Sequence, residues 1–223
     1  MIVLKKAAEP RILITKKVEW TQEILDILAK DEKPTKTQKT RYNHREIKSA
    51  IVAETHGKCA YCESQITHID HGDIEHLVPK SKVPARAFEW VNLTLACRKC
   101  NQNKGDFHGG ANDHSGLVDP YIDIPEDHFL FMRELVIARP DSARGIITDS
   151  EIKISRLELV EKRRERMEFI DGLVTGYLNA PNELKPILLQ DIYDKCTSPK
   201  REFTAVGTHY LSKLVTLNIL PVP

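Results

Sequence analysis

The stretch that decides the fold runs from residue 59 to residue 104 and reads CAYCESQITHIDHGDIEHLVPKSKVPARAFEWVNLTLACRKCNQNK. It contains two C-x-x-C pairs, Cys59 with Cys62 and Cys97 with Cys100. Two cysteines at this spacing can bind one metal ion from the same side, and two such pairs complete a tetrahedral shell of four thiolates. We therefore predict a structural Zn²⁺ site at these four cysteines, which contributes folding free energy to a small unit.

Two other interpretations of the cysteines are weaker. Four unrelated buried cysteines would not be expected to fall into two matched pairs. A redox C-x-x-C motif accompanies a thioredoxin-like βαβ pattern, which this sequence lacks. The fifth cysteine, Cys196, has no paired neighbour, and we interpret it as a small buried hydrophobic residue.

Residues between and just after the cysteine pairs supply the groups that phosphodiester hydrolysis needs. His76 can deprotonate a water molecule, because the pKa of histidine lies near physiological pH. Glu75 and Asn101 offer oxygen ligands for a hard divalent cation, which neutralises charge on the leaving oxygen. Lys104 lies three residues after Asn101, on the same face of a predicted helix, where it can touch a phosphate.

In their order along the chain, these motifs resemble the HNH endonuclease family. The resemblance rests on C-x-x-C, I-E-H-x-x-P-K, W-x-N-L and C-x-x-C-N-x-x-K. It implies a β-β-α-metal finger in which His76 is the general base and Asn92 orients His76. It further implies that Asn101 and Glu75 bind the catalytic Mg²⁺ or Mn²⁺, while the cysteines hold zinc away from the reaction.

Two positions depart from the family pattern. Glu75 stands where aspartate is common, and Asn101 stands where the family name expects histidine. Asparagine suits Mg²⁺ better than softer metals. Adjacent strand residues point to opposite faces, so Glu75 and His76 can serve one site only if the strand ends or twists there, and the nearby Pro79 favours an end.

Basic residues gather around the predicted site, although the net charge of the 223-residue chain is only +1. Residues 77–104 contain six basic side chains and one acidic side chain. Such a patch attracts a phosphate backbone, and its contacts position a nucleic acid without reading its sequence. Taken alone, the pattern is equally consistent with a solvated basic surface. The candidate nucleic-acid-binding residues are Lys80, Lys82, Arg86, Arg98, Lys99 and Lys104.

A narrower resemblance covers mainly the stretch from Cys59 to Tyr121. The segments E-H-L-V-P-K-S-K, F-E-W-V-N-L-T-L-A-C-R-K-C-N-Q-N-K-G-D and L-V-D-P-Y, with a later I-S-R-L-E-L and the early Lys5-Lys6…Glu9-Pro10, are similar to a bacterial subgroup. That subgroup is the HNH subunit of ATPase-coupled anti-phage systems, including Septu and some retron systems. The resemblance implies an ATPase partner that docks on the N-terminal arm and the C-terminal helices.

The predicted fold class is α+β, an HNH finger with a four-cysteine zinc site between two flanking regions. We expect an N-terminal arm and linker over residues 1–43, a nuclease core over 44–125 and a mainly helical region over 126–223. In the arm, residues 1–19 look extended or irregular, Thr21 begins a short helix that ends near Ala29, and residues 30–42 form an exposed loop. A helix follows over residues 44–56, with Gly57 as its stop.

The C-terminal region begins with a predicted hairpin around residues 129–138, followed by Pro140, Gly145 and Ile146 to Thr148. Ser155 and Glu158 form the pattern of a capping box for a long helix. Two more helices are expected over residues 181–196 and 203–214. The long helix would bury a face made of Leu157, Val160, Met167, Ile170, Val174 and Leu178.

Composition excludes several classes of protein. With 41% hydrophobic and 29% charged residues, the chain is typical of globular rather than disordered proteins. No run approaches the roughly 18 apolar residues of a membrane span. The start, MIVLKKAAEPRILITKK, is a poor signal peptide, so we expect a cytoplasmic protein without a membrane partner.

The leading prediction is Mg²⁺- or Mn²⁺-dependent hydrolysis of DNA by the nuclease subunit of an ATPase-coupled defence system. A stand-alone restriction-type HNH endonuclease is the alternative within the enzymes, although no separate DNA-reading motif accompanies the finger. The alternative that is not an enzyme is a zinc module that binds nucleic acid or a protein without catalysis. It would leave the joint presence of Glu75, His76, Asn92 and Asn101 unexplained.

Overall fold

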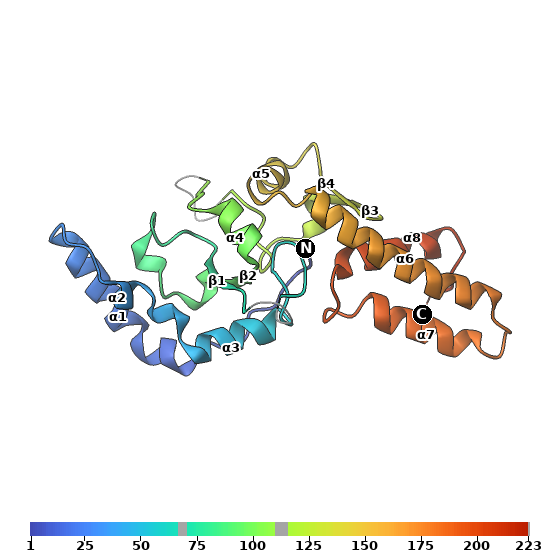
Figure 1. Ribbon diagram of the computed structural model, residues 1–223, viewed down its shortest axis with the longest axis horizontal. Helices are drawn as coiled ribbons and strands as arrows, with labels where there is room; N and C mark the ends of the chain where they lie inside the picture. Colours follow the sequence, from blue (N-terminus) through green and yellow to red (C-terminus); the bar gives the residue numbers. More distant parts are fainter. Residues whose placement is uncertain (67–70, 110–115, 223) are drawn as a thin grey trace.

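The computed structural model describes residues 1–66, 71–109 and 116–222 and shows an elongated molecule with a small sheet near its middle (Figure 1). The N-terminal helices lie at one end and the last three helices at the other. Helices combined with short antiparallel strands confirm the predicted α+β class. The α-helices are α1 (Arg11–Ala29), α2 (Lys36–Lys39), α3 (Arg45–Glu54), α4 (Arg98–Lys104), α5 (Ala143–Ile152), α6 (Leu157–Asn179), α7 (Lys185–Cys196) and α8 (Thr204–Thr216).

The finger consists of two short strands and a helix. β1 (Asp73–His76) pairs antiparallel with β2 (Leu93–Ala96), and α4 follows β2 directly. Asp73 lies opposite Ala96, and His76 lies opposite Leu93. The backbone N–H of Ala60 donates to the carbonyl oxygen of Leu95 at 2.9 Å, which ties the first cysteine turn to the strand that leads into the second.

The helix α3 leads into the first cysteine turn and agrees with the predicted helix over residues 44–56. It begins after His44, whose Nδ1 accepts a hydrogen bond from the backbone N–H of Glu46. The helix ends at Glu54, and the first residue after its C-cap Thr55 is His56, which has a left-handed φ of 54°. Gly57, predicted at that place, comes one residue later with a φ of 71°, and its backbone N–H donates to the Val52 carbonyl oxygen at 2.8 Å. The helix therefore stops before Gly57, one residue earlier than predicted.

The prediction of extended or irregular structure over residues 1–19 holds for residues 1–10 and was wrong from Arg11 onward, because α1 begins there rather than near Thr21. Pro10 precedes the helix, where its missing N–H is not needed. Leu13 and Ile24 are both buried and lie three helical turns apart on one face. The β-branched residues Ile12, Ile14 and Thr15 favour a strand locally, but packing of this face overrides that preference.

The segment predicted as an exposed loop over residues 30–42 also contains helix. Thr35 and Gln38 form a capping box at the start of α2, with the Gln38 backbone N–H donating to Thr35 Oγ1 at 3.3 Å. A 3-10 turn, η1 (Arg41–Asn43), follows and buries Tyr42. The two short elements return the chain to the finger, so this segment is part of the folded unit.

The hairpin in the C-terminal region closes within residues 129–138, as β3 (Phe129–Met132) and β4 (Leu135–Ala138). Residues 146–148, expected to extend the hairpin, instead belong to α5. The predicted Ser155–Glu158 capping box does not form, because Ser155 Oγ donates to Asp149 Oδ2 at 2.8 Å. The two helices predicted near the C-terminus are present as α7 and α8.

The buried face of α6 differs in part from the predicted one. Met167, Ile170 and Val174 are buried as expected, whereas Leu157 and Leu178 are exposed. Leu159, Arg163 and Tyr177 are buried in their place. The structure therefore places a buried arginine, Arg163, on a face that an apolar pattern cannot predict.

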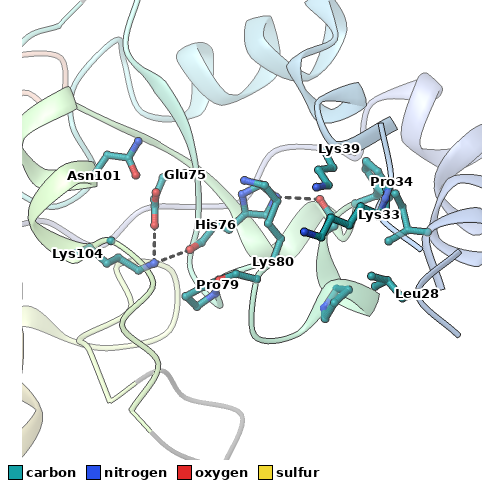
Figure 2. A pocket seen from close by; sticks show the side chains of 16 residues that line it. Leu28, Lys33, Pro34, Lys39, Glu75, His76, Pro79, Lys80, Asn101 and Lys104 are labelled. Carbon is teal, nitrogen blue, oxygen red and sulfur yellow. Dashed lines mark hydrogen bonds and ion pairs between the residues drawn. The ribbon is translucent and has the colours of Figure 1, made fainter. Parts of the chain in front are cut away.

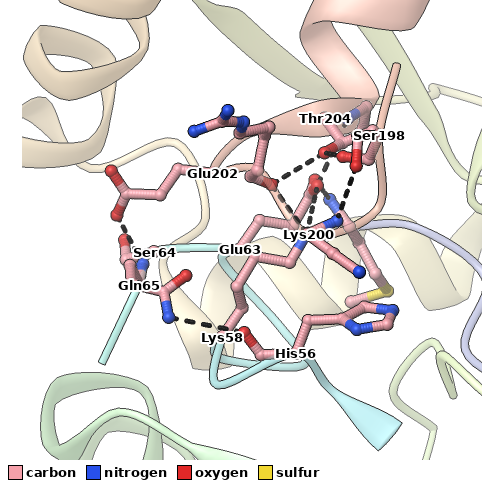
Figure 3. Close-up of polar contacts among 12 residues, drawn as sticks. His56, Lys58, Glu63, Ser64, Gln65, Ser198, Lys200, Glu202 and Thr204 are labelled. Carbon is pink, nitrogen blue, oxygen red and sulfur yellow. Dashed lines mark hydrogen bonds and ion pairs between the residues drawn. The ribbon is translucent and has the colours of Figure 1, made fainter. Parts of the chain in front are cut away.

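A buried polar network attaches the C-terminal helices to the first cysteine turn (Figure 3). Lys58 Nζ donates to the carbonyl oxygen of Arg201 at 2.8 Å. Glu63 Oε2 accepts a hydrogen bond from the backbone N–H of Ala205 at 3.2 Å, and Lys58 Nζ lies 3.9 Å from the same carboxylate. Burial lowers the pKa of Lys58, although Glu63 opposes this shift. These buried contacts join two segments that are about 140 positions apart in the sequence.

Among the described residues, no helix is both long and apolar enough to cross a membrane.

The packing of α1 can be tested with two neighbouring residues of opposite burial. Leu13→Ala should lower the free energy of unfolding by about 2–5 kcal/mol, because the side chain is fully buried. Ile14→Ala, at a side chain that is 62% exposed, should change it by less than about 0.5 kcal/mol. Urea denaturation followed by circular dichroism would measure both. Equal effects of the two substitutions would contradict the burial of this face of α1.

Candidate active site and metal centre

Four cysteines from two chain segments meet in one cluster. The sulfur atoms of Cys59, Cys62, Cys97 and Cys100 all lie within 4.8 Å of one another. The Cys62 and Cys97 sulfurs are 3.9 Å apart, close to the roughly 3.8 Å edge of a tetrahedron with metal–sulfur bonds of about 2.3 Å. Cys97 also begins α4, since its sulfur accepts a hydrogen bond from the Cys100 backbone N–H. The four cysteines are therefore positioned to bind a metal ion.

The cluster favours thiolate at two of its members. Hydrogen bonding, chiefly with Cys100, lowers the pKa of Cys62 and that of Cys97. Burial raises the pKa of Cys59. Within residues 1–66, 71–109 and 116–222, no second group of three or more histidine, cysteine or carboxylate side chains lies close enough to hold an ion. Any further metal site in this part of the chain must therefore use other ligands as well, such as amide oxygens.

An arginine outside the sequence motif contacts the cysteine cluster. Nη1 and Nη2 of Arg156 each lie 3.6 Å from Cys100 Sγ. Four thiolates around a divalent ion carry a net charge of −2, so a guanidinium at this position stabilises the loaded cluster. Arg156 lies 56 positions from Cys100 and directly precedes α6, so no local spacing could have identified it.

His76 lies at the end of β1, inside the protein and fixed by one hydrogen bond. Its Nε2 is 3.0 Å from the carbonyl oxygen of Ala87. Because a carbonyl oxygen only accepts, Nε2 carries the proton, and Nδ1 of the neutral ring is left as a base. Burial, with the positive charge of Lys80, lowers the pKa of His76 to about 3. The ring of Tyr42 packs edge-on against the imidazole at a centroid distance of 4.6 Å.

Asn92 does not contact the His76 ring, and its effect on that ring is indirect. Its Nδ2 donates to the carbonyl oxygens of Val78 and Arg86, at 3.0 and 2.9 Å. Its Oδ1 accepts from the Val78 backbone N–H at 2.7 Å. Asn92 thus links Val78 to Arg86, the residue before Ala87, whose carbonyl oxygen is hydrogen-bonded to His76.

Glu75, Asn101 and Lys104 lie together beside His76, as Figure 2 shows. Lys104 Nζ is 2.6 Å from Glu75 Oε1 and donates to the His76 carbonyl oxygen at 2.8 Å. Burial raises the pKa of Glu75, and Lys104 opposes that shift. Glu75 and His76 line the same cavity although they are adjacent on a strand. Adjacent strand residues normally point to opposite faces, but β1 ends at His76, as the sequence required for a shared site.

The donor set beside His76 suits a hard cation. Asn101 Nδ2 donates to Asp73 Oδ2 at 2.8 Å, so the amide oxygen of Asn101 is directed away from Asp73. Figure 2 shows this side chain turned toward the Glu75 carboxylate. A carboxylate oxygen and an amide oxygen placed in this way can bind a hard cation together. Asp73 is a residue that the sequence motif missed, although it lies two positions before Glu75 on the same strand face.

The six predicted nucleic-acid-binding residues are placed differently from one another. Lys80 lines the cavity beside His76, and Arg98 and Lys99 are exposed on α4. Lys82 pairs with Asp106 at 3.1 Å, and Arg86 pairs with Glu89 at 2.8 Å. Lys104 is only 2% exposed, and its ammonium is engaged by Glu75 and His76. This placement revises the prediction for Lys104, which supports the site from inside instead of offering a free charge at the surface.

Comparison with known families agrees with this geometry. Residues 59–107 match a family model described as HNH endonuclease, and the match spans both cysteine pairs, β1, β2 and α4. The chain therefore contains an HNH endonuclease domain.

Two curated relatives are both named Septu protein PtuB. The protein from Bacillus thuringiensis is 29% identical over 129 residues, which cover 57% of this chain and 45% of the relative. The protein from Bacillus mycoides (strain KBAB4) is 26% identical over 214 residues, which cover 78% of this chain and 72% of the relative. The match thus spans less than half the length of the first relative.

The role of Arg156 can be tested by metal release. Arg156→Gln should speed loss of the metal to a chelator by about 10–100-fold, because removing a side chain that holds a metal ligand usually lowers the metal affinity by that factor. Arg156→Lys should show a smaller effect, since it retains the charge. A colorimetric chelator would follow the release. Arg164→Gln, at an exposed arginine of α6, is the matched control. Equal rates of metal release from this variant and from Arg156→Gln would refute the role of Arg156.

Proposed function

We propose that this protein is a metal-dependent HNH endonuclease that hydrolyses DNA phosphodiester bonds with His76 as general base. The observation that carries the proposal is the hydrogen bond between His76 Nε2 and the Ala87 carbonyl oxygen. It fixes the tautomer in which Nδ1 can accept a proton. The low pKa of His76 keeps the ring neutral at physiological pH, so the base form is present before substrate binds.

The reaction follows from these placements. The Nδ1 atom of His76 takes a proton from a water molecule, and the water oxygen attacks phosphorus in line with the leaving oxygen. The new P–O bond forms as the bond to the leaving oxygen breaks, and the leaving oxygen is then protonated by solvent. Asn92 and Ala87 keep the imidazole from turning while the proton moves. Lys104 holds the Glu75 carboxylate and the end of β1 together, so the base and the metal-binding oxygens keep a fixed separation.

We assign the catalytic metal to Glu75 and Asn101, with Asp73 holding the Asn101 amide in place. Oxygen ligands of this kind suit Mg²⁺ or Mn²⁺. When bound, the ion neutralises charge on the phosphate and on the leaving oxygen. We assign Zn²⁺ to the four cysteines, since a closed shell of four thiolates is typical of structural zinc.

We further propose that the nuclease works in a defence system of the Septu type, together with an ATPase subunit. Support comes from the similarity to two Septu proteins PtuB, one of which aligns over 78% of this chain. That alignment extends well beyond the 49 residues of the HNH match, so the flanking helices share the likeness. The N-terminal arm and the C-terminal helices are the parts that would contact the ATPase.

The role of His76 can be tested on plasmid DNA with Mg²⁺ or Mn²⁺. His76→Ala should lower the cleavage rate by about 10²–10⁴-fold, the usual contribution of a general base. Zinc content and thermal midpoint should stay near those of the wild type. His209→Ala, at a surface histidine of α8, is the matched control and should cleave normally. If the wild type cleaves and His76→Ala cleaves at more than about a tenth of its rate, His76 is not the base.

The assignment of the catalytic metal can be tested by Mg²⁺ titration. Asn101→Ala removes a ligand, and Asp73→Ala removes the acceptor that orients it. Each should raise the Mg²⁺ concentration for half-maximal cleavage by about 10–100-fold. Calorimetric titration with Mn²⁺ provides a second readout that does not depend on turnover. Gln102→Ala, at the exposed neighbour on α4, should leave both values unchanged, and the assignment fails if Asn101→Ala does the same.

A further inference from the structure

The cavity beside His76 has two walls that come from different parts of the chain. It measures about 460 Å³. The finger supplies one wall with Glu75, His76, Lys80, Asn101 and Lys104. The other wall comes from α1, α2 and the segment between them, and its residues are Ile24, Leu28, Lys33, Pro34 and Lys39. Figure 2 shows the labelled members of this second wall facing His76 and Lys80.

The charge on both walls is positive. The lining contains four lysines and a single carboxylate, Glu75, which is already paired with Lys104. Within the described part of the chain, the ammonium groups of Lys33 and Lys39 make no ion pair or hydrogen bond, in contrast to those of Lys82 and Lys104. Two uncompensated ammonium groups across a cleft from the proposed base are placed to bind anionic groups of a substrate.

The second wall also carries apolar side chains. Of its members Ile24, Leu28 and Pro34, only Leu28 is exposed, at 41%. Sites that bind single-stranded nucleic acid combine a positively charged groove for the backbone with side chains, usually aromatic, against which unpaired bases pack. Leu28 is the side chain placed for such a contact here. A duplex keeps its bases stacked inside and could not offer them to Leu28.

The size of the cavity points to the same class of substrate. Pockets of about 300–1,000 Å³ enclose one small ligand, which corresponds here to one nucleotide unit with its phosphate. The proposed base lies within this enclosure and is only 4% exposed. A recessed base between two walls favours a single strand, which is narrower than a duplex, as the substrate that reaches His76.

We propose that the α1–α2 segment is the second wall of the nuclease cleft and that Lys33 and Lys39 hold the backbone of a single-stranded DNA segment there. The proposal rests on the function proposed above and deepens it by naming the substrate class. It also assigns a role to residues that the sequence motif does not contain. Lys80 completes the set from the finger side, where it donates to the Tyr42 hydroxyl at 3.2 Å.

The test measures DNA binding in a His76→Ala background, so that nothing is cut. Fluorescence anisotropy compares labelled oligodeoxythymidylate with a duplex of the same length, using the zinc-loaded full chain. We expect tighter binding of the single strand. Lys33→Ala with Lys39→Ala should weaken that binding by about tenfold and reduce the salt slope by about 1.4, the value for two lost phosphate contacts to a single strand.

The matched control is Lys30→Ala with Lys36→Ala. These two lysines are exposed in the same segment and change the net charge equally, but they do not line the cavity. This double variant should weaken binding of the single strand by less than about twofold, because neither lysine is placed to contact a phosphate in the cavity. Equal weakening by the two pairs, or tighter binding of the duplex, would overturn the proposal. All four sites are exposed, and thermal midpoints would verify that both double variants fold.

The outcome is separable from that of the nuclease proposal. Cleavage by the wild type that depends on His76, together with unchanged binding by the Lys33→Ala and Lys39→Ala variant, would reject the second wall and leave the nuclease standing. Selective loss of single-strand binding in that variant, with no cleavage by the wild type even when the ATPase subunit is present, would support the cleft and reject the hydrolysis.

Discussion

A cluster of four cysteines, three of them buried, joins two chain segments that are far apart in the sequence. The finger between and after them has two strands of four residues and a helix of seven. Elements of this length bury too little apolar surface to fold alone, so the ion that the cysteines can bind supplies part of the folding free energy. Other parts of the chain also contact this cluster. Arg156 lies against Cys100. The turn that carries Cys59 and Cys62 is hydrogen-bonded to Arg201, just before α8, and to Ala205, at its start.

The candidate active site is held in place by contacts that fix the loop between β1 and β2. The strands fix the two ends of the loop, and Asn92 ties Val78 to Arg86 across it. The carbonyl oxygen of Ala87 then has one position, and His76 has one orientation. Each restraint is a hydrogen bond inside a buried region, where competition from water is weak. The imidazole of the proposed base is therefore oriented by the fold itself, as preorganised catalysis requires.

The parts predictable from the sequence are those governed by short spacing. The two C-x-x-C pairs predicted the cysteine cluster, and the I-E-H and C-x-x-C-N patterns predicted that Glu75, His76 and Asn101 would meet in one cavity. Contacts between residues far apart in the sequence leave no spacing pattern. For this reason the sequence did not predict Asp73, Arg156 or the cavity wall on α1. Local propensity misled at the N-terminus, where packing of Leu13 and Ile24 turns β-branched residues into helix.

The early residues Lys6, Glu9 and Pro10 acquire physical roles from the same tertiary contacts. Glu9 pairs with Lys17, and Pro10 precedes α1. Lys6 Nζ donates to Glu54 Oε1 and to the Leu93 carbonyl oxygen and lies 3.9 Å from the Trp90 ring centroid. Leu93 pairs with His76 across the sheet, so the partly buried Lys6 ammonium connects the N-terminal segment to the strand opposite the proposed base. Displacing this segment would leave the buried Glu54 carboxylate and the Leu93 carbonyl oxygen without this partner, which destabilises the fold around the proposed base.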